Sequence, residues 1–305
     1  MLAERLKRGD TIGVIAPDKA LYNYNKDREY LENATKYFES LGLRVKYGKY
    51  LFSEDEYCAG TPLQRATDLN EMFSDKEVKA IFTIKGGDMA NGILPYIDFE
   101  NIKNNPKIFC GMSDITVLLC AINKMTGLIT FHCNGYTIFG QNEVTDYDKN
   151  EIIDKLFEGN KVIIPIEDRE FYGLENEIVE GKIYGTNSIG LLRLLGTQYM
   201  PNLKDSILFL EDYHSNIIKW NAMLEQYNQM GAFNKAVVFG YIYQLQYEEN
   251  NKYDIVKELN KINSNIPIVK TNDFGHIHAN SIIPIGVNVT INGIDKSIKL
   301  DKYLI

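Results

Sequence analysis

The chain has 305 residues and a net charge of -8 at pH 7, with 45% hydrophobic and 24% charged residues, values typical of a soluble globular protein of two domains. The negative charge argues against binding to nucleic-acid phosphates, and no apolar run approaches the roughly 20 residues that span a bilayer. The N-terminus lacks the apolar core of a signal peptide, so we expect a cytoplasmic protein with no membrane or nucleic-acid partner.

Residues 1–140 alternate between predicted strands and helices. The expected strands are 11–16, 43–47, 80–84, 108–110 and 128–131, and the expected helices are 26–41, 62–73 and 115–125. Gly127 is expected to close the last of these helices. This alternation predicts an α/β fold, with a parallel sheet covered on both faces and right-handed crossovers.

Residues 141–178 are polar, with one predicted helix at 147–157, and are expected to form a linker and covering loop. Beyond this segment the strands become shorter and more closely spaced. The expected strands are 207–210, 236–243, 266–269, 282–285, 287–291 and 297–300, and the expected helices are 188–195 and 220–230. This pattern predicts a smaller mixed α+β or barrel-like domain over residues 179–305.

The cysteines and histidines, four of each, are arranged neither in a C-x-x-C pair nor in an H-E-x-x-H motif. Two of the cysteines, Cys110 and Cys120, lie within apolar segments, so reduced and mostly buried thiols are expected. With no Cys/His cluster of metal-ligand spacing, we expect no dedicated metal site.

Ser113 follows the strand 108–110 and precedes the helix 115–125. A serine between a strand end and a helix start projects its hydroxyl above the edge of the sheet. The helix N-terminus favours negative charge at that point, which suits a nucleophile. The commoner role of serine at such a position is a helix N-cap, and the local sequence taken alone favours capping.

Gly86-Gly87 comes directly after the strand 80–84. In open α/β sheets, ligands bind at the carboxyl ends of the strands, where two glycines let backbone N–H groups approach a substrate atom. A plain turn is the commoner meaning of Gly-Gly. The pair lacks the spacing of a P-loop or of a dinucleotide site.

Two other strand ends carry groups that could activate a serine. Glu211 follows an apolar strand, and His276 follows Gly275, which permits an unusual backbone angle. Serine needs a base to take its proton, and the base needs a third group to fix its tautomer. Ser113, His276 and Glu211 could fill these roles, although each is more often structural. In an extended segment His278 would point to the same side as His276, so the pattern leaves both histidines open.

Short motifs in a fixed order carry a family resemblance. They are Gly9–Pro17, Arg65–Leu69, Lys85–Gly87, Leu94–Asp98, Gly111–Thr116, Gly196-Thr197, Ile207–Asp212, Phe274–His276 and Pro284–Gly286. Together they extend over nearly the whole chain, which resembles the LD-carboxypeptidase family of serine peptidases. That family includes the microcin C immunity proteins.

The resemblance implies a flavodoxin-like domain at 1–140 and a C-terminal domain at 179–305, with the active site in the cleft between them. It implies that Ser113 is the nucleophile, Glu211 the orienting acid and His276, rather than His278, the general base. Backbone N–H groups of Asp114 and of the Gly86-Gly87 turn are implied as the oxyanion hole. The resemblance also implies a cytoplasmic homodimer that uses no cofactor.

Two segments depart from the family pattern, Asp88–Asn91 and Phe131–Gly135, and both are expected to line the cleft. The expected substrate is a small peptide, cleaved at the L,D-bond before a terminal D-alanine of a cell-wall muropeptide. One alternative is a peptidyl- or aminoacyl-adenylate, as in microcin C immunity, and another is a cleft that binds a ligand without catalysis. An intact Ser-Glu-His set favours an enzyme.

Aromatic residues bear on the choice between the two substrates, because an adenylate needs a surface on which its base can stack. The only tryptophan, Trp220, falls within a helical pattern and is expected in the core. Phe171 and Tyr172, in the segment between the domains, could stack but need not. The sequence therefore favours a peptide substrate.

Overall fold

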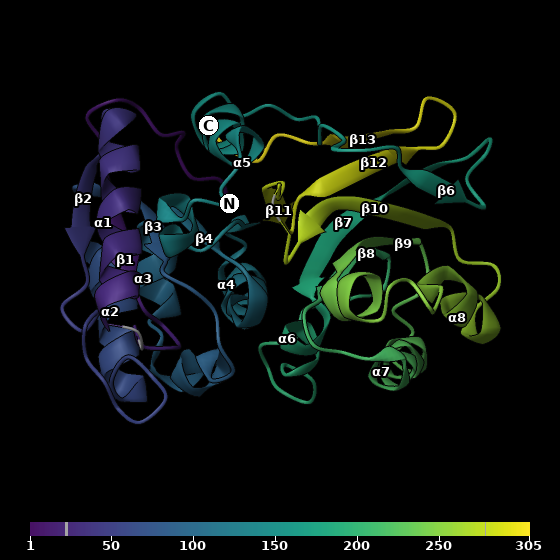
Figure 1. Cartoon of the computed structure of the whole chain (residues 1–305), viewed down its shortest axis with the longest axis horizontal. Coiled ribbons are helices and arrows are strands. Elements are labelled where there is room, and N and C mark those ends of the chain that lie inside the picture. The colour runs from purple at the N-terminus through teal and green to yellow at the C-terminus, as the bar shows by residue number, and fades with distance from the viewer. Residues whose placement is uncertain (22–23, 278) are drawn as a thin grey trace.

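The computed structural model describes residues 1–21, 24–277 and 279–305, which form two sheets, each with its own helices (Figure 1). His278, the second candidate base, lies outside the described residues. None of the described helices is long and apolar enough to cross a bilayer.

The first sheet has the strand order β11-β5-β4-β3-β1-β2. Its parallel strands are β1 (Thr11–Ile15), β2 (Arg44–Tyr47), β3 (Val78–Thr83), β4 (Ile108–Gly111) and β5 (Thr130–His132). The parallel part therefore runs 2-1-3-4-5, the flavodoxin order. The predicted fold class is confirmed, and strands β1 and β4 are buried along their whole length, as strands covered on both faces must be.

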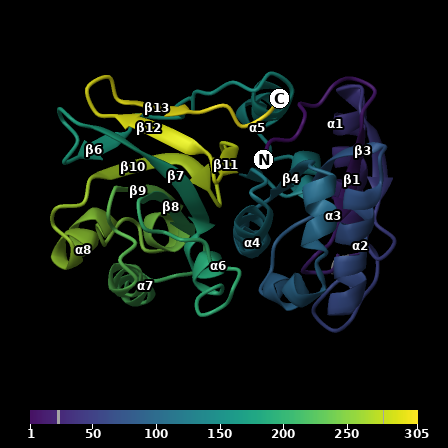
Figure 2. The same ribbon diagram turned by 180° about the vertical axis from the view of Figure 1, so that it is seen from behind.

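The helices that accompany the first sheet include α1 (Tyr24–Ser40), α2 (Pro62–Ser74), α3 (Phe99–Asn104) and α4 (Thr116–Thr126). Gly127 closes α4 in the left-handed conformation, with φ 75°, as predicted. The α4 helix packs against β5 on one side and against β7 (Ile178–Asn187) of the second sheet on the other. It lies between the two halves of the molecule in both views (Figures 1 and 2).

The second sheet has the order β13-β12-β7-β8-β9-β10-β6. Its parallel centre is β7, β8 (Ser206–Asp212), β9 (Ala236–Ile242) and β10 (Ile268–Gly275). The outer strands are antiparallel: β6 (Glu170–Tyr172), β12 (Asn288–Asn292) and β13 (Ser297–Leu300). The helices of this half are α6 (Ser188–Leu192), α7 (Ile217–Gln229) and α8 (Ile255–Ile262).

The structure differs from the predicted elements in several places. Helices α3 and α8, strand β6 and the full length of β7 were not predicted. The helix predicted at 147–157 is divided into α5 (Asp146–Glu151) and a π-helical turn, η4 (Ile152–Phe157). The signal for α8 was present, since its buried residues Ile255, Val256 and Leu259 share one face and Asp254 caps the helix. Helix α3 and strand β6 have only 6 and 3 residues, so tertiary packing decides their conformation.

Strand β11 (Ile283–Ile285) was expected with the C-terminal strands but pairs with β5 of the first sheet. The chain then returns to the second sheet, where the Gly286 N–H donates to the carbonyl of Ile183. Strand β6, within the predicted linker, joins the second sheet. The domain boundaries at 1–140, 141–178 and 179–305 stay a proposal. Two strands cross these boundaries: β11 pairs within the first sheet, and β6 pairs within the second.

The predictions for buried residues are confirmed where the structure tests them. Trp220 is 0% exposed within α7 and packs edge-on against Phe239. All four cysteines are free and buried. The chain ends lie together, since Ala3 and Leu304 form a parallel bridge, and both ends are near the junction of the two halves (Figure 1).

Candidate active site

Ser113 occupies the sharp turn between β4 and α4. Its φ is +61°, in the left-handed region that costs a non-glycine residue roughly 1–2 kcal/mol. The N-cap of the short 3-10 turn η2 (Ser113–Ile115) is Met112, and that of α4 is Ile115, with no side-chain capping bond at either. The capping role that the local sequence favoured is therefore wrong. Strain of this kind is typical of functional turns.

Glu211 and His276 form a close pair at the ends of β8 and β10. Glu211 Oε2 lies 2.6 Å from His276 Nδ1, and the Glu211 side chain is fully buried. Asn187 Nδ2 donates to the other carboxylate oxygen at 3.1 Å. With both oxygens engaged, the carboxylate is fixed in one orientation and leaves His276 Nε2 as the free nitrogen of the ring.

The two members of this pair shift each other's pKa. Burial alone would raise the pKa of Glu211, but the positive charge and hydrogen bond of His276 outweigh it, so that pKa is lowered. Burial would lower the pKa of His276, but the Glu211 carboxylate outweighs it and raises that pKa above its ordinary value. The pair is thus arranged to stabilise an imidazolium next to a carboxylate.

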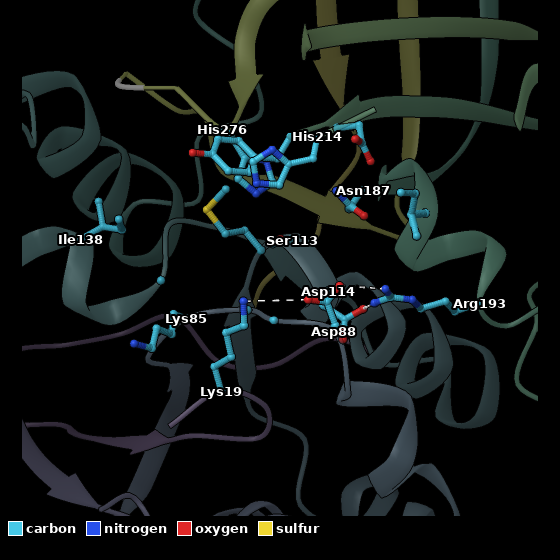
Figure 3. A pocket seen from close by; sticks show the side chains of 17 residues that line it. Lys19, Lys85, Asp88, Ser113, Asp114, Ile138, Asn187, Arg193, His214 and His276 are labelled. Atoms are coloured by element: carbon cyan, nitrogen blue, oxygen red, sulfur yellow. Dashed lines mark hydrogen bonds and ion pairs between the residues drawn. The ribbon is translucent and has the colours of Figure 1, made fainter. Parts of the chain in front are cut away.

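A cavity of about 380 Å³ opens between the two halves of the molecule and brings most of the predicted site together. Ser113, Asp114, Gly86, Gly87 and His276 line it. Glu211 is absent from the lining because it lies behind His276. In Figure 3, Ser113 lies between His276 and the ion pair of Asp114 with Arg193.

Ser113 Oγ makes no hydrogen bond to His276 within the part of the chain that the structure describes. Contacts between nucleophile and base are often longer in ligand-free enzymes and tighten when substrate binds. The hydrogen-bonded pair of His276 and Glu211 thus lies across a cavity from a strained serine.

Positions 86 and 87 require glycine because neighbouring atoms lie too close to leave room for a side chain. A methyl group on Gly86 would lie 2.8 Å from Ser113 Cβ and 3.1 Å from the Asp114 nitrogen. A methyl group on Gly87 would lie 2.4 Å from Asp18 Oδ1. Gly86 therefore lies directly against the Ser113 turn, and Gly87 lies against Asp18.

Two aspartates that the sequence analysis did not single out for their side chains hold this loop in place. Asp18 follows β1 and accepts the Met89 N–H at 3.1 Å, and the Asp114 carboxylate accepts the Ala90 N–H at 2.8 Å. Burial, and then the neighbouring carboxyl of Asp114, raise the pKa of Asp18 to about 7. Asp18 follows a strand that ends at the same sheet edge as Ser113, and this signal could have found it.

Arg193, also unpredicted, reaches from the end of α6 across the cavity. Its guanidinium pairs with Asp114, and its second terminal nitrogen lies 2.9 Å from Asp88. Asp88 in turn faces Lys19 at 3.8 Å. This chain of charges connects the second half of the molecule to the loop beside Ser113 (Figure 3).

A buried polar network supports the turn that carries His276. Asn280 Oδ1 accepts the Gly275 N–H at 3.0 Å and lies 3.3 Å from His132 Nε2, while His132 Nδ1 lies 2.6 Å from the Thr186 hydroxyl. Asn280 Nδ2 donates to Asn134 at 2.8 Å. Burial lowers the pKa of His132 to about 4, so the ring is neutral. The network ties the His276 turn to β5, the neighbour of the strand β4 that precedes Ser113.

The segments expected to line the cleft do so only in part. Of Asp88–Asn91, Asp88 lines the cavity, and of Phe131–Gly135, Gly135 does. His132 is buried in the network instead. Phe171 and Tyr172 lie on the edge strand β6 and are not part of the lining. No cluster of three or more metal-ligating side chains occurs among the described residues.

Comparison with known proteins places this geometry in a family. Residues 12–133 match the LD-carboxypeptidase N-terminal domain, and residues 180–291 match the LD-carboxypeptidase C-terminal domain. The chain is 32% identical to the putative carboxypeptidase YocD of Bacillus subtilis, over 99% of this chain and 100% of that one. It is 33% identical to a probable murein peptide carboxypeptidase of the same organism, over 96% and 92% of the two chains. The solved structure of the microcin C7 self-immunity protein MccF in complex with aspartyl sulfamoyl adenosine has a TM-score of 0.90 at 26% identity, covering both chains fully.

Proposed function

Because this chain belongs to the LD-carboxypeptidase family, we propose that it is a serine hydrolase in which Ser113, His276 and Glu211 cleave an L,D-amide bond. The family and the names of its relatives make it a peptidase. One observation supports the serine mechanism above the others. The Glu211–His276 pair, joined at 2.6 Å, opens on the same cavity as a serine held at φ +61°.

The proposed chemistry is acyl transfer in two halves. Ser113 Oγ attacks the scissile carbonyl carbon while His276 Nε2 takes its proton, and Glu211 stabilises the imidazolium that forms. Backbone N–H groups of Asp114 and of the Gly86-Gly87 turn receive the oxyanion. Gly86 is the closer of the two glycines to Ser113. The C–N bond then breaks, and His276 returns the proton to the departing amine. Water, activated by the same histidine, hydrolyses the ester and releases Ser113.

The proposed substrate is a cell-wall muropeptide, cleaved before its terminal D-alanine. The murein peptide carboxypeptidase name of a relative that aligns with 96% of this chain supports this choice. Trp220 is buried, and Phe171 and Tyr172 are not part of the cavity lining, which is consistent with the preference for a peptide. The proposal includes a cytoplasmic location and a homodimer, and needs no cofactor, since water is the only co-reactant.

A second candidate is hydrolysis of an aminoacyl or peptidyl nucleotide. The observation that favours it is the similarity to MccF, which was solved with aspartyl sulfamoyl adenosine and matches over the full length of both chains. A binding protein without catalysis is the third reading. The paired and oriented imidazole argues against it, because binding alone needs no activated hydroxyl.

The deciding experiment is side-by-side kinetics on a muropeptide tetrapeptide and an aminoacyl sulfamoyl-adenosine, with mass spectrometry of the products. Release of D-alanine from the tetrapeptide supports the leading proposal. Cleavage of the nucleotide compound alone would support the second candidate. Tight binding of either compound without turnover would favour the binding protein.

A further inference from the structure

A pair of buried aspartates holds the loop that leads into η1 (Ala90–Tyr96). Asp18 is 1% exposed and Asp114 is 2% exposed, and their carboxyl groups share a hydrogen bond. Asp18 accepts the Met89 N–H at 3.1 Å, and Asp114 accepts the Ala90 N–H at 2.8 Å. Two successive backbone N–H groups are thus held by one pair of carboxyl groups.

The Asp18 carboxyl group is packed directly against the same loop. A methyl group on Gly87 would lie 2.4 Å from Asp18 Oδ1, 2.5 Å from Cγ and 2.6 Å from Oδ2. One residue earlier, a methyl group on Gly86 would meet Ser113 Cβ at 2.8 Å. A displacement of the Asp18 carboxyl group is therefore passed to Gly87, and a displacement of the loop changes how Gly86 lies against the Ser113 turn.

The pair depends on one proton. Two carboxyl groups can share a hydrogen bond only if one of them is protonated, and two buried carboxylates repel each other. Asp114 is the charged partner, because its carboxylate pairs with the Arg193 guanidinium. Asp18 therefore carries the proton. Burial, and then Asp114, raise the pKa of Asp18 to about 7, so the proton is present below neutral pH and is lost above it.

The groups that face Asp18 from other elements leave this balance in place. Arg65 on α2 is buried, and its Nη1 donates to two backbone carbonyl oxygens at 2.7 and 3.1 Å. Its charge lowers the pKa of Asp18 by less than burial and Asp114 raise it. Cys58, in the segment before α2, has a pKa that is raised chiefly by burial, so its thiol is neutral at neutral pH.

We infer that Asp18 is a positioning residue: the proton that it shares with Asp114 holds the Gly86-Gly87 loop in the place that the oxyanion hole requires. The inference rests on the proposed function, in which backbone N–H groups of this loop receive the oxyanion. It goes beyond that function by giving the loop a second state. When Asp18 loses its proton to water, the two carboxylates repel, the loop moves relative to Ser113, and the transition state is stabilised less.

The test compares the pH dependence of kcat/KM between pH 6 and pH 9 in the wild type and three variants. The substrate is the muropeptide tetrapeptide, or the aminoacyl sulfamoyl-adenosine if that compound is the one cleaved. Asp18→Asn imitates the protonated carboxyl, since an amide can accept the Met89 N–H and donate to Asp114 without titrating. Asp18→Ala removes both hydrogen bonds.

Asp68→Asn is the matched control. Asp68 lies on α2 outside the cavity lining, is 3% exposed and accepts the Tyr50 N–H at 2.9 Å. Its Oδ2 would lie 2.4 Å from a methyl group on Gly48, and burial raises its pKa to about 6. Asp68 thus repeats the burial, the hydrogen bond and the raised pKa of Asp18 away from Ser113.

At pH 6 we expect Asp18→Ala to lose about tenfold in kcat/KM and Asp18→Asn to retain the activity that the alanine variant loses. At pH 9 the kcat/KM of Asp18→Asn should exceed that of the wild type by about tenfold, with the change centred near pH 7. The titration of His276 is common to both proteins and cancels in this ratio. For Asp68→Asn the ratio to the wild type should not change with pH. Circular dichroism at each pH checks that every protein is folded.

A ratio of Asp18→Asn to wild type that stays constant from pH 6 to pH 9 would overturn the inference and leave the proposed function standing, because hydrolysis continues. Wild-type activity of Asp18→Ala at pH 6 would do the same. A pH-dependent gain of equal size in Asp68→Asn would also overturn the inference, since the effect would then come from stability. If neither compound is cleaved at any pH, the proposed function and the inference are both overturned.

Discussion

The Glu211 carboxylate lies 2.6 Å from His276 Nδ1, although the two residues are 65 positions apart in the chain. They end strands β8 and β10, which are separated in the sheet by β9. The contact depends on Gly275, whose φ of +129° turns the chain over β9. A methyl group there would meet the Tyr241 carbonyl oxygen at 2.7 Å and Glu211 Cβ at 3.3 Å. The backbone conformation of one glycine thus brings His276 and Glu211 together.

Replacing Ser113 with alanine should abolish hydrolysis. Loss of a triad nucleophile typically removes several orders of magnitude from kcat. The fold should persist, because alanine adopts the same strained turn at the same cost. Product release followed by mass spectrometry, with circular dichroism as the control, tests this. Turnover close to wild type on any substrate would contradict the assignment of Ser113.

Replacing His276 and replacing His278 should have different effects. His276→Ala removes the base that Glu211 orients, so we expect a loss of several orders of magnitude in kcat. His278→Ala should stay within a few-fold of wild type. An inactive His278 variant beside an active His276 variant would reverse the assignment.

Glu211→Gln should change both the rate and its pH dependence. In the wild type the carboxylate raises the pKa of His276, so the acid limb of kcat/KM should lie above the ordinary histidine value of about 6.5. With glutamine the opposing charge is gone, and burial, which lowers the pKa of His276, remains. We expect the acid limb to move to lower pH and the plateau to fall by about 10²–10⁴-fold. An acid limb that moves to higher pH would show that the Glu211 carboxylate does not raise the pKa of His276.

Asp18→Asn should stabilise the protein at neutral pH. The pKa of Asp18 is about 7 in the folded chain, against about 3.9 when unfolded. Between these values the folded state holds a proton that the unfolded state has lost. The free energy of unfolding of the wild type therefore falls with rising pH, by at most about 1.4 kcal/mol per pH unit. Asparagine has no such titration and can still accept the Met89 N–H. In urea unfolding, the free energy of unfolding of the variant should exceed that of the wild type by a margin that grows from pH 4 to 7 and then stays constant. A margin that does not change with pH would contradict this prediction.

Asn280→Ala should weaken catalysis, although Asn280 does not line the cavity. It leaves the Gly275 N–H and the Asn134 side-chain oxygen without their Asn280 partner, at a cost in unfolding free energy of about 2 kcal/mol. Because the Gly275 N–H holds the His276 turn, we expect kcat to fall about tenfold, while KM changes less. Asn202→Ala, at an exposed position, is the control. A change confined to stability would show that Asn280 has no positioning role.

Much of the fold could be predicted from local pattern. Apolar runs in the sequence predicted the buried strands β1, β4 and β8, and Gly127 predicted the end of α4. These features could be predicted because strand burial and helix termination depend on neighbours in sequence. Helix α8 and the transfer of β11 to the first sheet were not predicted. The transfer of β11 depends on packing partners far away in the chain, which a local pattern does not contain. Helix α8, by contrast, has a local amphipathic pattern and an Asp254 N-cap, and this signal was overlooked.

The sequence by itself determined that Ser113, Glu211 and His276 each follow an apolar strand, since glycines and polar residues after buried runs mark strand ends. Only the tertiary structure decided which strand ends meet. It also decided that Ser113 is strained rather than capping, that Asp18 shares its surroundings with Asp114, and that Tyr213 stacks on His276. These relations come from the order of strands in two sheets and from the approach of Gly86 and Gly275 to their neighbours. Close contact between distant segments is a property of packing, and residue type and spacing do not specify it.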